Sequence, residues 1–305
     1  MIRRVLLLPG QGIQHVGMIE QFERYPWSNE ILKQVDDALG FSLSKMMKEG
    51  PESDLNLTEF AQPAIMVSSI LHWTFLKHLY GAREDGFSFA LGHSLGEYSA
   101  CVISGALTVE QGAKLAYIRG KSMQEAVEGL AIRMSAVAAS EETVRKSLNE
   151  VQIDGICEIA GVNHDKQVVL SGTRESVDLV TDHMKQKYKV PIKSLNVSAP
   201  FHCRLMKPAA DRVKAELEKM DVKPAKIPVI SNAHSKGLTD PNEIKQSLVD
   251  NITNPAWFLR GMEYCLSNGS NLFTEVGAKR VLTNIVNKIM KDRNLEGLIL
   301  DLNEK

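Results

Sequence analysis

The chain has 305 residues, of which 44% are hydrophobic and 24% charged, and these values are ordinary for a globular protein with a substantial core. Its net charge of −1 gives no reason to expect nucleic acid or an anionic membrane as a partner. The four cysteines show no C-x-x-C spacing, so they indicate reduced thiols and neither a metal site nor a disulfide framework. No apolar run approaches the length of about 18 residues that a membrane span needs. We therefore expect a soluble intracellular protein, cytoplasmic in a bacterium or located in the mitochondrial matrix in a eukaryote.

The first predicted element is a buried strand over residues 5–8, followed by the turn PGQG at 9–12. A short apolar run without alternation is typical of a parallel sheet covered on both faces. The turn places backbone N–H groups at the carboxyl edge of the sheet, where open α/β sheets bind ligands. Apolar spacing then predicts helices over 28–49 and 58–80, with Gln62 near the start of the second, where its amide either supports a neighbouring loop or caps the helix.

The motif GHSLG at 92–96 lies between a strand-like run at 87–91 and a helical stretch at 97–103. Strand, tight turn and helix in this order are typical of a nucleophile elbow. Ser94 is then the candidate nucleophile, and it needs a base within hydrogen-bond reach. The backbone N–H of Leu95, at the start of the helix, suits an oxyanion. The alternative is a glycine-rich turn with an ordinary serine.

The helix predicted over 108–127 carries Arg119 at the edge of its apolar stripe, away from its other charged residues. A buried arginine needs an anionic partner, and its planar fork suits a carboxylate in two-point contact. Either that partner is a protein carboxylate and Arg119 is structural, or it is the carboxylate of the substrate.

Between residues 130 and 197 the pattern changes to short alternating elements. The predicted order is strand 132–139, helix 141–151, strand 156–162, strand 168–171, helix 175–187 and strand 191–197. The order βαββαβ is typical of a ferredoxin-like domain. We therefore expect an α/β fold, with a hydrolase-like parallel-sheet core domain formed by 1–129 and 198–305 and a small ferredoxin-like domain inserted at 130–197.

His202 lies where the chain returns to the large domain, between a strand end and a helix at 204–219. It is the strongest candidate for the base that Ser94 requires, although His93 and His234 lie at comparable turns. The remaining predicted elements are a strand at 227–232, a helix at 254–267, a strand and turn at 271–277, and a helix at 281–290.

Several motifs together resemble one family, the malonyl-CoA:acyl carrier protein transacylases with the acyltransferase domains of polyketide and fatty acid synthases. They occur in the family's order and cover nearly the whole chain: PGQG at 9–12, AQPA at 61–64, GHSLGE at 92–97, RGKSMQ at 119–124, PFH at 200–202 and EVG at 275–277.

The resemblance implies a ping-pong acyl transfer without a cofactor, in an enzyme expected to be a monomer. Ser94 would take malonyl from the coenzyme A thioester and pass it to the phosphopantetheine thiol of an acyl carrier protein. His202 would be the general base and later the acid. The backbone N–H groups of Gln11 and Leu95 would form the oxyanion hole, and Arg119 would hold the free carboxylate of malonyl.

The resemblance also implies the rest of the site. It places Phe201 where it favours malonyl over methyl-branched acyl groups, and it puts three more side chains in the substrate pocket: Gln62, His93 and Asn163. Members of the family orient the histidine through a backbone carbonyl, and Asn232 matches the position that supplies it.

The sequence departs from the family's pattern at three places. Ile13 replaces a serine, Ile132 and Arg133 replace small residues, and Ala278-Lys279 replaces Pro-Gly. None of these removes a catalytic group, but Ile132 and Arg133 leave open how the acyl or pantetheine portion is lined.

Two other functions compete with this one. A serine esterase or thioesterase of the α/β-hydrolase type needs an acid after the serine and a histidine near the C-terminus, and the last histidine here is His234. A docking subunit without turnover would not need Ser94, His202 and Arg119 together. The sequence does not distinguish fatty acid from polyketide synthesis.

Overall fold

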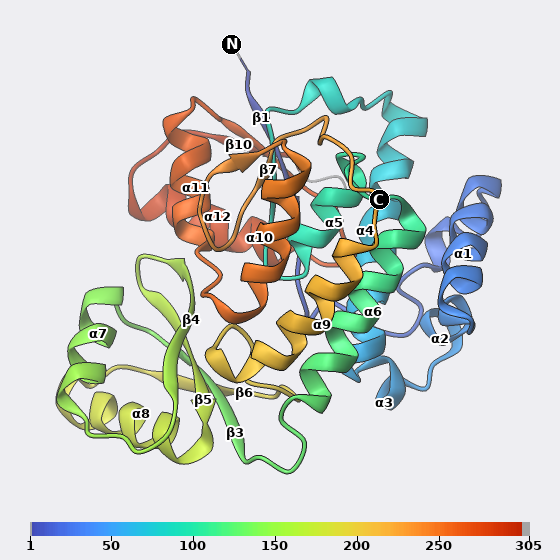
Figure 1. Cartoon of the computed structure of the whole chain (residues 1–305). Helices are drawn as coiled ribbons and strands as arrows, with labels where there is room; N and C mark the ends of the chain where they lie inside the picture. Colours follow the sequence, from blue (N-terminus) through green and yellow to red (C-terminus); the bar gives the residue numbers. More distant parts are fainter. Residues whose placement is uncertain (1, 301–305) are drawn as a thin grey trace.

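The computed structural model describes residues 2–300, which form two sheets and the helices packed on them (Figure 1). The strands of the large sheet are β1 (Arg4–Leu8), β2 (Phe89–Gly92), β7 (Val229–Ile230), β8 (Gly237–Leu238), β9 (Leu272–Glu275) and β10 (Leu298–Leu300). Their spatial order is β10-β9-β1-β2-β7-β8, and every pair is parallel except β7 with β8. The prediction of an α/β fold built on a parallel sheet is confirmed.

Strand β1 lies in the middle of this sheet and is covered on both faces. Leu6 and Leu8 belong to one hydrophobic core, whereas Val5 and Leu7 belong to the other, and all four are fully buried. Successive side chains of a strand point to opposite faces, so an uninterrupted apolar run supplies both cores at once. The prediction for residues 5–8 is therefore confirmed.

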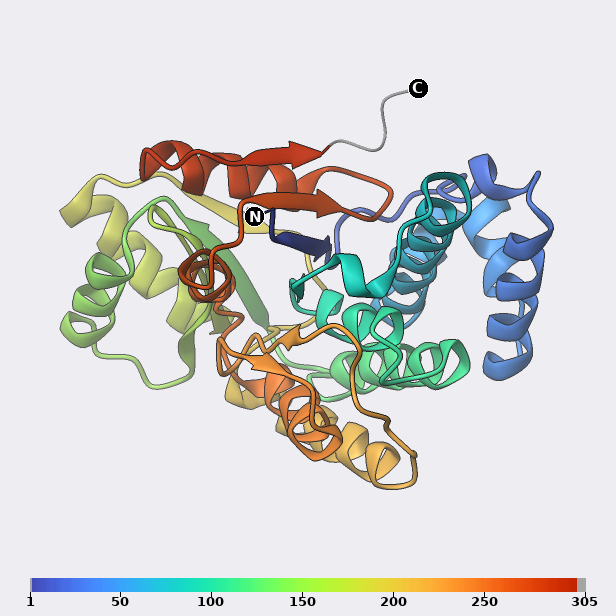
Figure 2. The ribbon, with the colours of Figure 1, turned by 90° about the horizontal axis from the view of Figure 1, so that it is seen from above.

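Helices cover the two faces unequally. The larger core contains residues of α4 (Thr58–Tyr80), α5 (Gly96–Ile103), α6 (Val109–Glu125), α9 (Lys207–Glu218) and α10 (Pro241–Thr253). The other core is closed by α11 (Phe258–Ser267) and α12 (Val281–Asp292). Further elements of this part of the chain are α1 (Pro26–Leu39), α2 (Leu43–Glu49), α3 (Glu52–Leu55) and the 3-10 turns η1 (Glu20–Phe22), η2 (Glu84–Gly86) and η3 (Arg204–Met206). Viewed from above, α1 and α2 lie at the opposite end of the molecule from the small sheet (Figure 2).

Two helix predictions need correction. The helix expected over 28–49 is two helices, because Gly40 ends α1 in a left-handed conformation with φ 77° and Ser42 then caps α2. The helix predicted over 58–80 is confirmed as α4. The helix expected from residue 254 begins at Phe258.

Helix α10 was not predicted, although its start has a clear signal. Asp240 accepts hydrogen bonds from the backbone N–H groups of Asn242 and Glu243, and Pro241 occupies the first helical position. Both features are typical of a helix N-terminus. This omission matters because α10 carries residues of the site described below.

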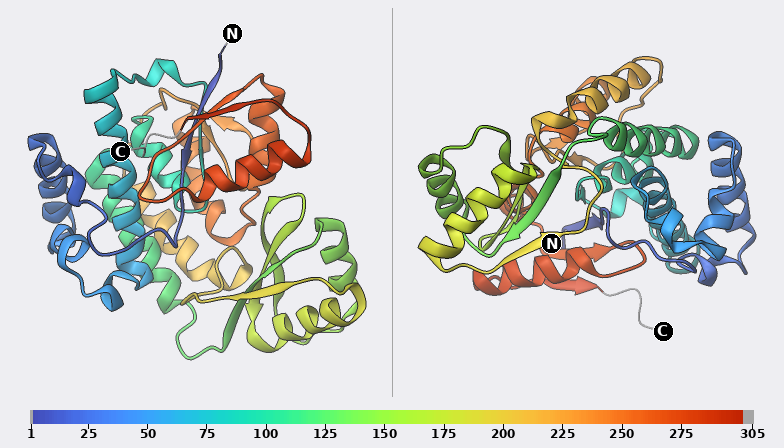
Figure 3. Two further views of the ribbon diagram at one scale, coloured as in Figure 1. Left: turned by 180° about the vertical axis from the view of Figure 1, so that it is seen from behind. Right: turned by 90° about the horizontal axis from the view of Figure 1, so that it is seen from below.

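The second sheet comprises β3 (Ile132–Val137), β4 (Cys157–His164), β5 (Gln167–Thr173) and β6 (Ile192–Leu195), with α7 (Glu141–Glu150) and α8 (Arg174–Tyr188) between them. Its spatial order is β4-β5-β3-β6, and each neighbouring pair is antiparallel. Figure 3 shows this sheet and its two helices gathered on one side of the large sheet. The edge strand β4 also contacts the large unit directly, because Ala256 N donates to Ala160 O at 2.8 Å and Val162 N donates to Ala256 O at 3.2 Å.

Candidate active site

A cleft of about 540 Å³ lies between the carboxyl ends of β1 and β2 and the small sheet. Nine of the ten candidate site residues line it: Gln11, Gln62, His93, Ser94, Leu95, Arg119, Asn163, Phe201 and His202. Its apolar wall comes largely from Met134, Ala160, Val169, Leu195 and Val197. The cleft is thus polar where Ser94 lies and apolar along the small sheet.

Ser94 occupies the tight turn between β2 and α5, where its φ of 54° is left-handed. The turn needs glycine at two positions because backbone passes very close to both. A Cβ atom would lie 1.9 Å from Gly96 C if placed on Gly92, and 2.0 Å from Leu8 O if placed on Gly96. Asn232 holds the turn from below, since its Oδ1 accepts from Ser94 N at 2.8 Å and its Nδ2 donates to Gly92 O at 2.9 Å.

His202 is the histidine that meets Ser94. Its Nε2 lies 2.8 Å from Ser94 Oγ, and its Nδ1 lies 2.8 Å from Asn251 O and 3.1 Å from Asn254 O. Carbonyl oxygens only accept hydrogen bonds, so Nδ1 must carry the proton and Nε2 is free to accept the serine proton. Burial, then the nearby charges of Arg119 and His93, lower the pKa of His202 to about 3, so the imidazole is neutral at pH 7.

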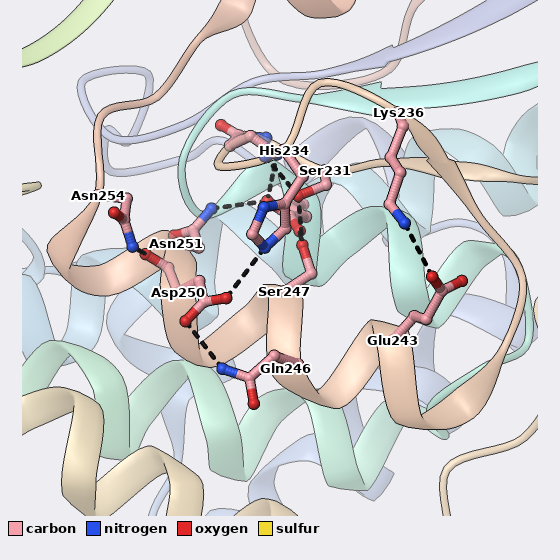
Figure 4. A network of polar contacts seen from close by, with 11 residues as sticks. Ser231, His234, Lys236, Glu243, Gln246, Ser247, Asp250, Asn251 and Asn254 are labelled. Carbon is pink, nitrogen blue, oxygen red and sulfur yellow. Dashed lines mark hydrogen bonds and ion pairs between the residues drawn. The ribbon is translucent and has the colours of Figure 1, made fainter.

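The other two candidate histidines lie elsewhere. His93 Nε2 is 2.9 Å from Asn163 Oδ1, so this ring bridges the elbow to β4. His234 Nε2 is 2.9 Å from Asp250 Oδ2, on the side of α10 shown in Figure 4. Neither ring contacts Ser94, which leaves His202 as the base that the geometry supports.

The expectation that Asn232 orients the histidine is wrong. Its side chain holds the serine turn, and its own carbonyl accepts from Trp257 N at 3.0 Å. The carbonyls that hold His202 come from Asn251, in the last turn of α10, and from Asn254, which follows it. Figure 4 shows the positions of these two asparagines. The last carbonyls of a helix have no partner within the helix, so they are available to a side chain such as this imidazole.

Arg119 is 1% exposed and lies beneath Ser94. Its Nη1 donates to Gln62 Oε1 at 2.8 Å, and its Nη2 donates to Ser94 Oγ at 3.1 Å and to Asn251 Oδ1 at 2.9 Å. Within residues 2–300 no carboxylate lies at ion-pair distance from this guanidinium, and its Nε has no hydrogen-bond partner. A buried cation whose direct hydrogen-bond partners are all neutral is prepared for an anion from outside the chain.

Gln11 and Leu95, the two residues expected to form the oxyanion hole, line the cleft together with Ser94. In the described part of the chain, neither backbone N–H has a backbone acceptor, although Leu95 is buried and buried N–H groups are nearly always paired. The Gln11 turn is fixed by its side chain, whose Nε2 donates to Thr58 Oγ1 at 3.2 Å, and Thr58 in turn contacts Ser198 Oγ at 2.6 Å. Two fixed N–H donors next to a serine are what an oxyanion requires.

The departures at the entry to the small sheet do not reach the cleft. Arg133 forms an ion pair with Asp178 of α8 at 3.0 Å and donates to Ser194 of β6 at 2.9 Å. Neither Arg133 nor Ile132 lines the cleft, whereas Met134 does. The charge of Arg133 is thus held away from the apolar wall that Met134 and its neighbours form.

Glu97, Asn251 and Asn254 belong to this site and were not identified from the sequence as site residues. Glu97 is part of the GHSLGE motif, but a single acidic residue in the first turn of a helix is more often a simple helix-start residue. The two asparagines act partly through backbone carbonyls. Every residue has such a carbonyl, so the residue type does not reveal this role. Only the start signal of α10 could have directed attention to them.

The chain matches the acyl transferase domain family over residues 5–299. It is 34% identical over 294 residues to the malonyl CoA-acyl carrier protein transacylase of Bacillus subtilis, and the match covers 95% of this chain and 91% of that protein. This chain belongs to the acyl transferase domain family.

Solved structures agree with this membership. The acyl-carrier-protein S-malonyltransferase of Bartonella henselae is 34% identical, with a TM-score of 0.92 over 99% of this acyl transferase and 96% of that chain. A malonyl-transacylase in complex with a type II PKS acyl-carrier protein is 31% identical, with a TM-score of 0.92 over 99% of this chain and 96% of that one. The sequence resemblance is therefore confirmed.

Two further findings bear on this acyl transferase. Within residues 2–300, no helix combines the length and the apolar character needed to cross a bilayer. In the same range, the side chains of His, Cys, Asp and Glu form no cluster of three that could hold a metal ion.

Proposed function

We propose that this acyl transferase moves malonyl from malonyl-CoA to the phosphopantetheine thiol of an acyl carrier protein through a malonyl ester of Ser94. One observation carries the proposal: a fully buried arginine with no protein carboxylate in direct contact lies beneath the Ser94–His202 pair. A neutral acyl ester gives no reason for such a charge, whereas the second carboxylate of malonyl does.

In the first half-reaction, Ser94 Oγ attacks the thioester carbonyl carbon while its proton passes to His202 Nε2. The N–H groups of Gln11 and Leu95 donate to the oxygen that becomes negative in the tetrahedral intermediate. The intermediate then collapses with cleavage of the carbon–sulfur bond, and His202 gives its proton to the departing thiolate. The products are free coenzyme A and malonyl-Ser94.

In the second half-reaction, the pantetheine thiol of the carrier gives its proton to His202, and its sulfur attacks the ester. Collapse now breaks the bond to Ser94 Oγ, which recovers the proton. The carbonyls of Asn251 and Asn254 keep the imidazole in one tautomer throughout, so a buried acid is not required for the proton transfers.

The carboxylate of malonyl would bind the guanidinium of Arg119, whose Nη2 donates to Ser94 Oγ at 3.1 Å. Gln62 supports that guanidinium from its Nη1 side, and His93 and Asn163 fix the opposite wall through their mutual hydrogen bond. Phe201, which is 9% exposed next to His202, would restrict the space available to a branched acyl group.

Several finer assignments accompany this proposal. The order β, α, β, β, α, β and the antiparallel strand order β4-β5-β3-β6 support a ferredoxin-like domain at 130–197, inserted into a hydrolase-like core of 1–129 and 198–305. The enzyme would act as a monomer without a cofactor. The carrier would be that of fatty acid or polyketide synthesis.

The test is a short exposure of the protein to malonyl-CoA, followed by intact-mass measurement and peptide mapping. We expect a malonyl adduct on the Ser94 peptide that disappears on addition of holo carrier protein, with malonyl appearing on the carrier. Release of free malonate at the same rate without carrier would instead indicate a thioesterase. Absence of any adduct would indicate a subunit without turnover.

A further inference from the structure

Glu97 is a second buried charge under the elbow, and the proposed reaction does not use it. It lies in the first turn of α5 and is 1% exposed. Its Oε2 accepts from Asn232 N at 2.9 Å and from Asn251 Nδ2 at 2.8 Å, and its Oε1 accepts from Ser247 Oγ. Three donors and no cation at ion-pair distance surround this carboxylate within residues 2–300.

Asn251 joins the two buried charges. Its Oδ1 accepts from Arg119 Nη2 at 2.9 Å, while its Nδ2 donates to Glu97 and, at 3.2 Å, to Ser94 O. A guanidinium only donates, so the amide oxygen must face Arg119 and the amide nitrogen must face Glu97. One amide therefore separates the carboxylate from the guanidinium and is oriented by both.

Apart from each other, the Arg119 guanidinium and the Glu97 carboxylate have only uncharged neighbours among residues 2–300. The amide of Gln62 and the ring of Tyr98, whose centroid lies 5.1 Å from Arg119 Cζ, complete the surroundings of the guanidinium. Ser247 and Ser231 complete the surroundings of the carboxylate, and their Oγ atoms are hydrogen-bonded to each other at 2.6 Å (Figure 4). Arg119 and Glu97 are each only 1% exposed, and opposite charges separated by a short distance interact strongly in such a medium of low dielectric constant.

We propose that Glu97 is the counter-charge of Arg119 in the empty enzyme and that it thereby sets how strongly the cleft binds the carboxylate of the substrate. This inference rests on the proposed function, because it takes the substrate carboxylate as the external ligand of Arg119. When that carboxylate enters, Arg119 faces two anions, so Glu97 weakens the binding of malonyl relative to an uncharged acyl group. Glu97 is a positioning residue that acts through Asn251.

The experiment is Glu97→Gln combined with Ser94→Ala, which prevents turnover, with binding of malonyl-CoA and acetyl-CoA measured by calorimetry. Glutamine preserves the contacts, since its carbonyl can accept from Asn232 and Asn251 while its NH₂ donates to Ser247. Removing the charge should tighten the binding of malonyl-CoA by about tenfold and leave that of acetyl-CoA unchanged. Equal changes for the two ligands, or none, would overturn the inference.

The Ser94→Ala variant alone separates this inference from the proposed function. If it binds malonyl-CoA no better than acetyl-CoA, the proposed function fails, and Glu97 has no substrate carboxylate to oppose. If it prefers malonyl-CoA and the preference does not grow with Glu97→Gln, only the role of Glu97 fails.

Glu275 provides a matched control. It is also a buried carboxylate, but it accepts from the N–H groups of Val281, Leu282 and Thr283 at the start of α12 and does not line the cleft. In the same Ser94→Ala background, Glu275→Gln should lower thermal stability without changing the ratio of the two affinities. A rise in malonyl preference equal to that of Glu97→Gln would contradict the proposal, because any lost buried charge would then have the same effect.

A second measurement applies if Glu97→Gln does not fold well. A buried unpaired guanidinium destabilises a protein, whereas removal of both members of a buried pair is much less costly. The double variant Glu97→Gln/Arg119→Gln should therefore melt at a higher temperature than Glu97→Gln alone. If it melts at the same or a lower temperature, the two charges are not partners.

Discussion

Ser94 and His202 both adopt left-handed backbone conformations, with φ of 54° and 60°, and their side chains meet at 2.8 Å. Such conformations are uncommon outside glycine and persist only where the surroundings impose them. For Ser94 the surroundings are the hydrogen bond to Asn232 and the close backbone packing of the turn, and for His202 they are the carbonyls of Asn251 and Asn254. The geometry of the pair is thus fixed before any substrate arrives.

Ser94→Ala should abolish the acyl-enzyme and reduce transfer by several powers of ten, because it removes the nucleophile. The fold should be unaffected, since only a hydroxyl is lost from a turn held by backbone contacts. Intact-mass measurement after exposure to malonyl-CoA, together with thermal melting, tests both statements. A malonyl adduct on another residue of the variant would show that the nucleophile is assigned wrongly.

His202→Ala should slow both half-reactions by about 10²- to 10⁴-fold, the usual scale for loss of a general base. Rapid-quench measurement of acylation and of transfer to the carrier separates the two halves. His234→Ala is a suitable control, because that histidine pairs with Asp250 and does not contact Ser94. If only one half-reaction slows, His202 does not act as both base and acid.

The pH dependence of acylation follows from the buried state of His202. Its pKa is lowered to about 3, mainly by burial, so the imidazole stays neutral as pH falls well below the ordinary histidine value. We therefore expect the acylation rate to remain nearly constant between about pH 7 and about pH 5. A decline centred near pH 6.5, the value of an unperturbed histidine, would show that a more exposed group is the base.

Protonation of the unfolded chain gives the corresponding effect on stability. An unfolded histidine takes up a proton near pH 6.5, whereas folded His202, and folded His72 with its pKa lowered to about 4 by burial, do not. The free energy of unfolding therefore falls as pH is lowered. The two histidines contribute fully to it above pH 6.5, and progressively less as pH falls toward their folded pKa values. Denaturant unfolding of wild type and His72→Gln at pH 7.5 and 5.5 should show a smaller pH effect in the variant.

Gly96→Ala should destabilise the protein by about 3 kcal/mol or more, because the added Cβ would overlap Leu8 O at 2.0 Å and displace the turn that carries Ser94. Gly86→Ala is the matched control, since a Cβ there meets no atom within 4 Å. Denaturant unfolding of the two variants should differ by most of that amount. Similar stabilities would mean that the turn can shift to accept a side chain.

The sequence predicted those parts of the fold that a local pattern determines. The apolar run at 5–8 indicated a doubly covered strand because every residue in it is buried in one core or the other. Helices α1 and α2 were merged because apolar periodicity continues across Gly40, and only the left-handed conformation of that residue ends the first helix. Helix α10 was not predicted, although Asp240-Pro241 is a typical helix start.

The residues of the candidate site also fall into those that a local pattern identifies and those that it does not. Ser94, His202 and Arg119 could be identified because each needs a side chain of a particular chemistry at a particular turn or face. The acceptors of His202 could not, because a backbone carbonyl is present at every residue, and Asn232 was chosen by its place in the family's pattern. Its amide in fact holds the serine turn. The bridge through Asn251 depends on three elements meeting in space, which no local pattern encodes.

The variant Arg119→Ala most clearly distinguishes malonyl transfer from the alternatives, which are a serine esterase or thioesterase and a purely structural role for Arg119. If the guanidinium binds the malonyl carboxylate, the variant should lose about 3 kcal/mol or more of malonyl transfer, while acetyl transfer should fall little or rise. Arg119→Lys should recover only part of the loss, because an ammonium cannot form two parallel hydrogen bonds. Both acyl groups are measured side by side on protein of known melting temperature.

Arg293→Ala supplies the comparison that a purely structural arginine requires. Arg293 pairs with Asp165 and with Glu263, both at 2.7 Å, and does not line the cleft. Its removal should lower the melting temperature and reduce malonyl and acetyl transfer in equal proportion, since it would loosen the contact between α12 and the small sheet without touching the acyl group. If Arg119→Ala behaves in the same way, with equal losses for the two substrates, Arg119 supports its helix and does not bind the carboxylate. An inverted preference in Arg119→Ala, absent from Arg293→Ala, can arise only where the lost charge faced the substrate.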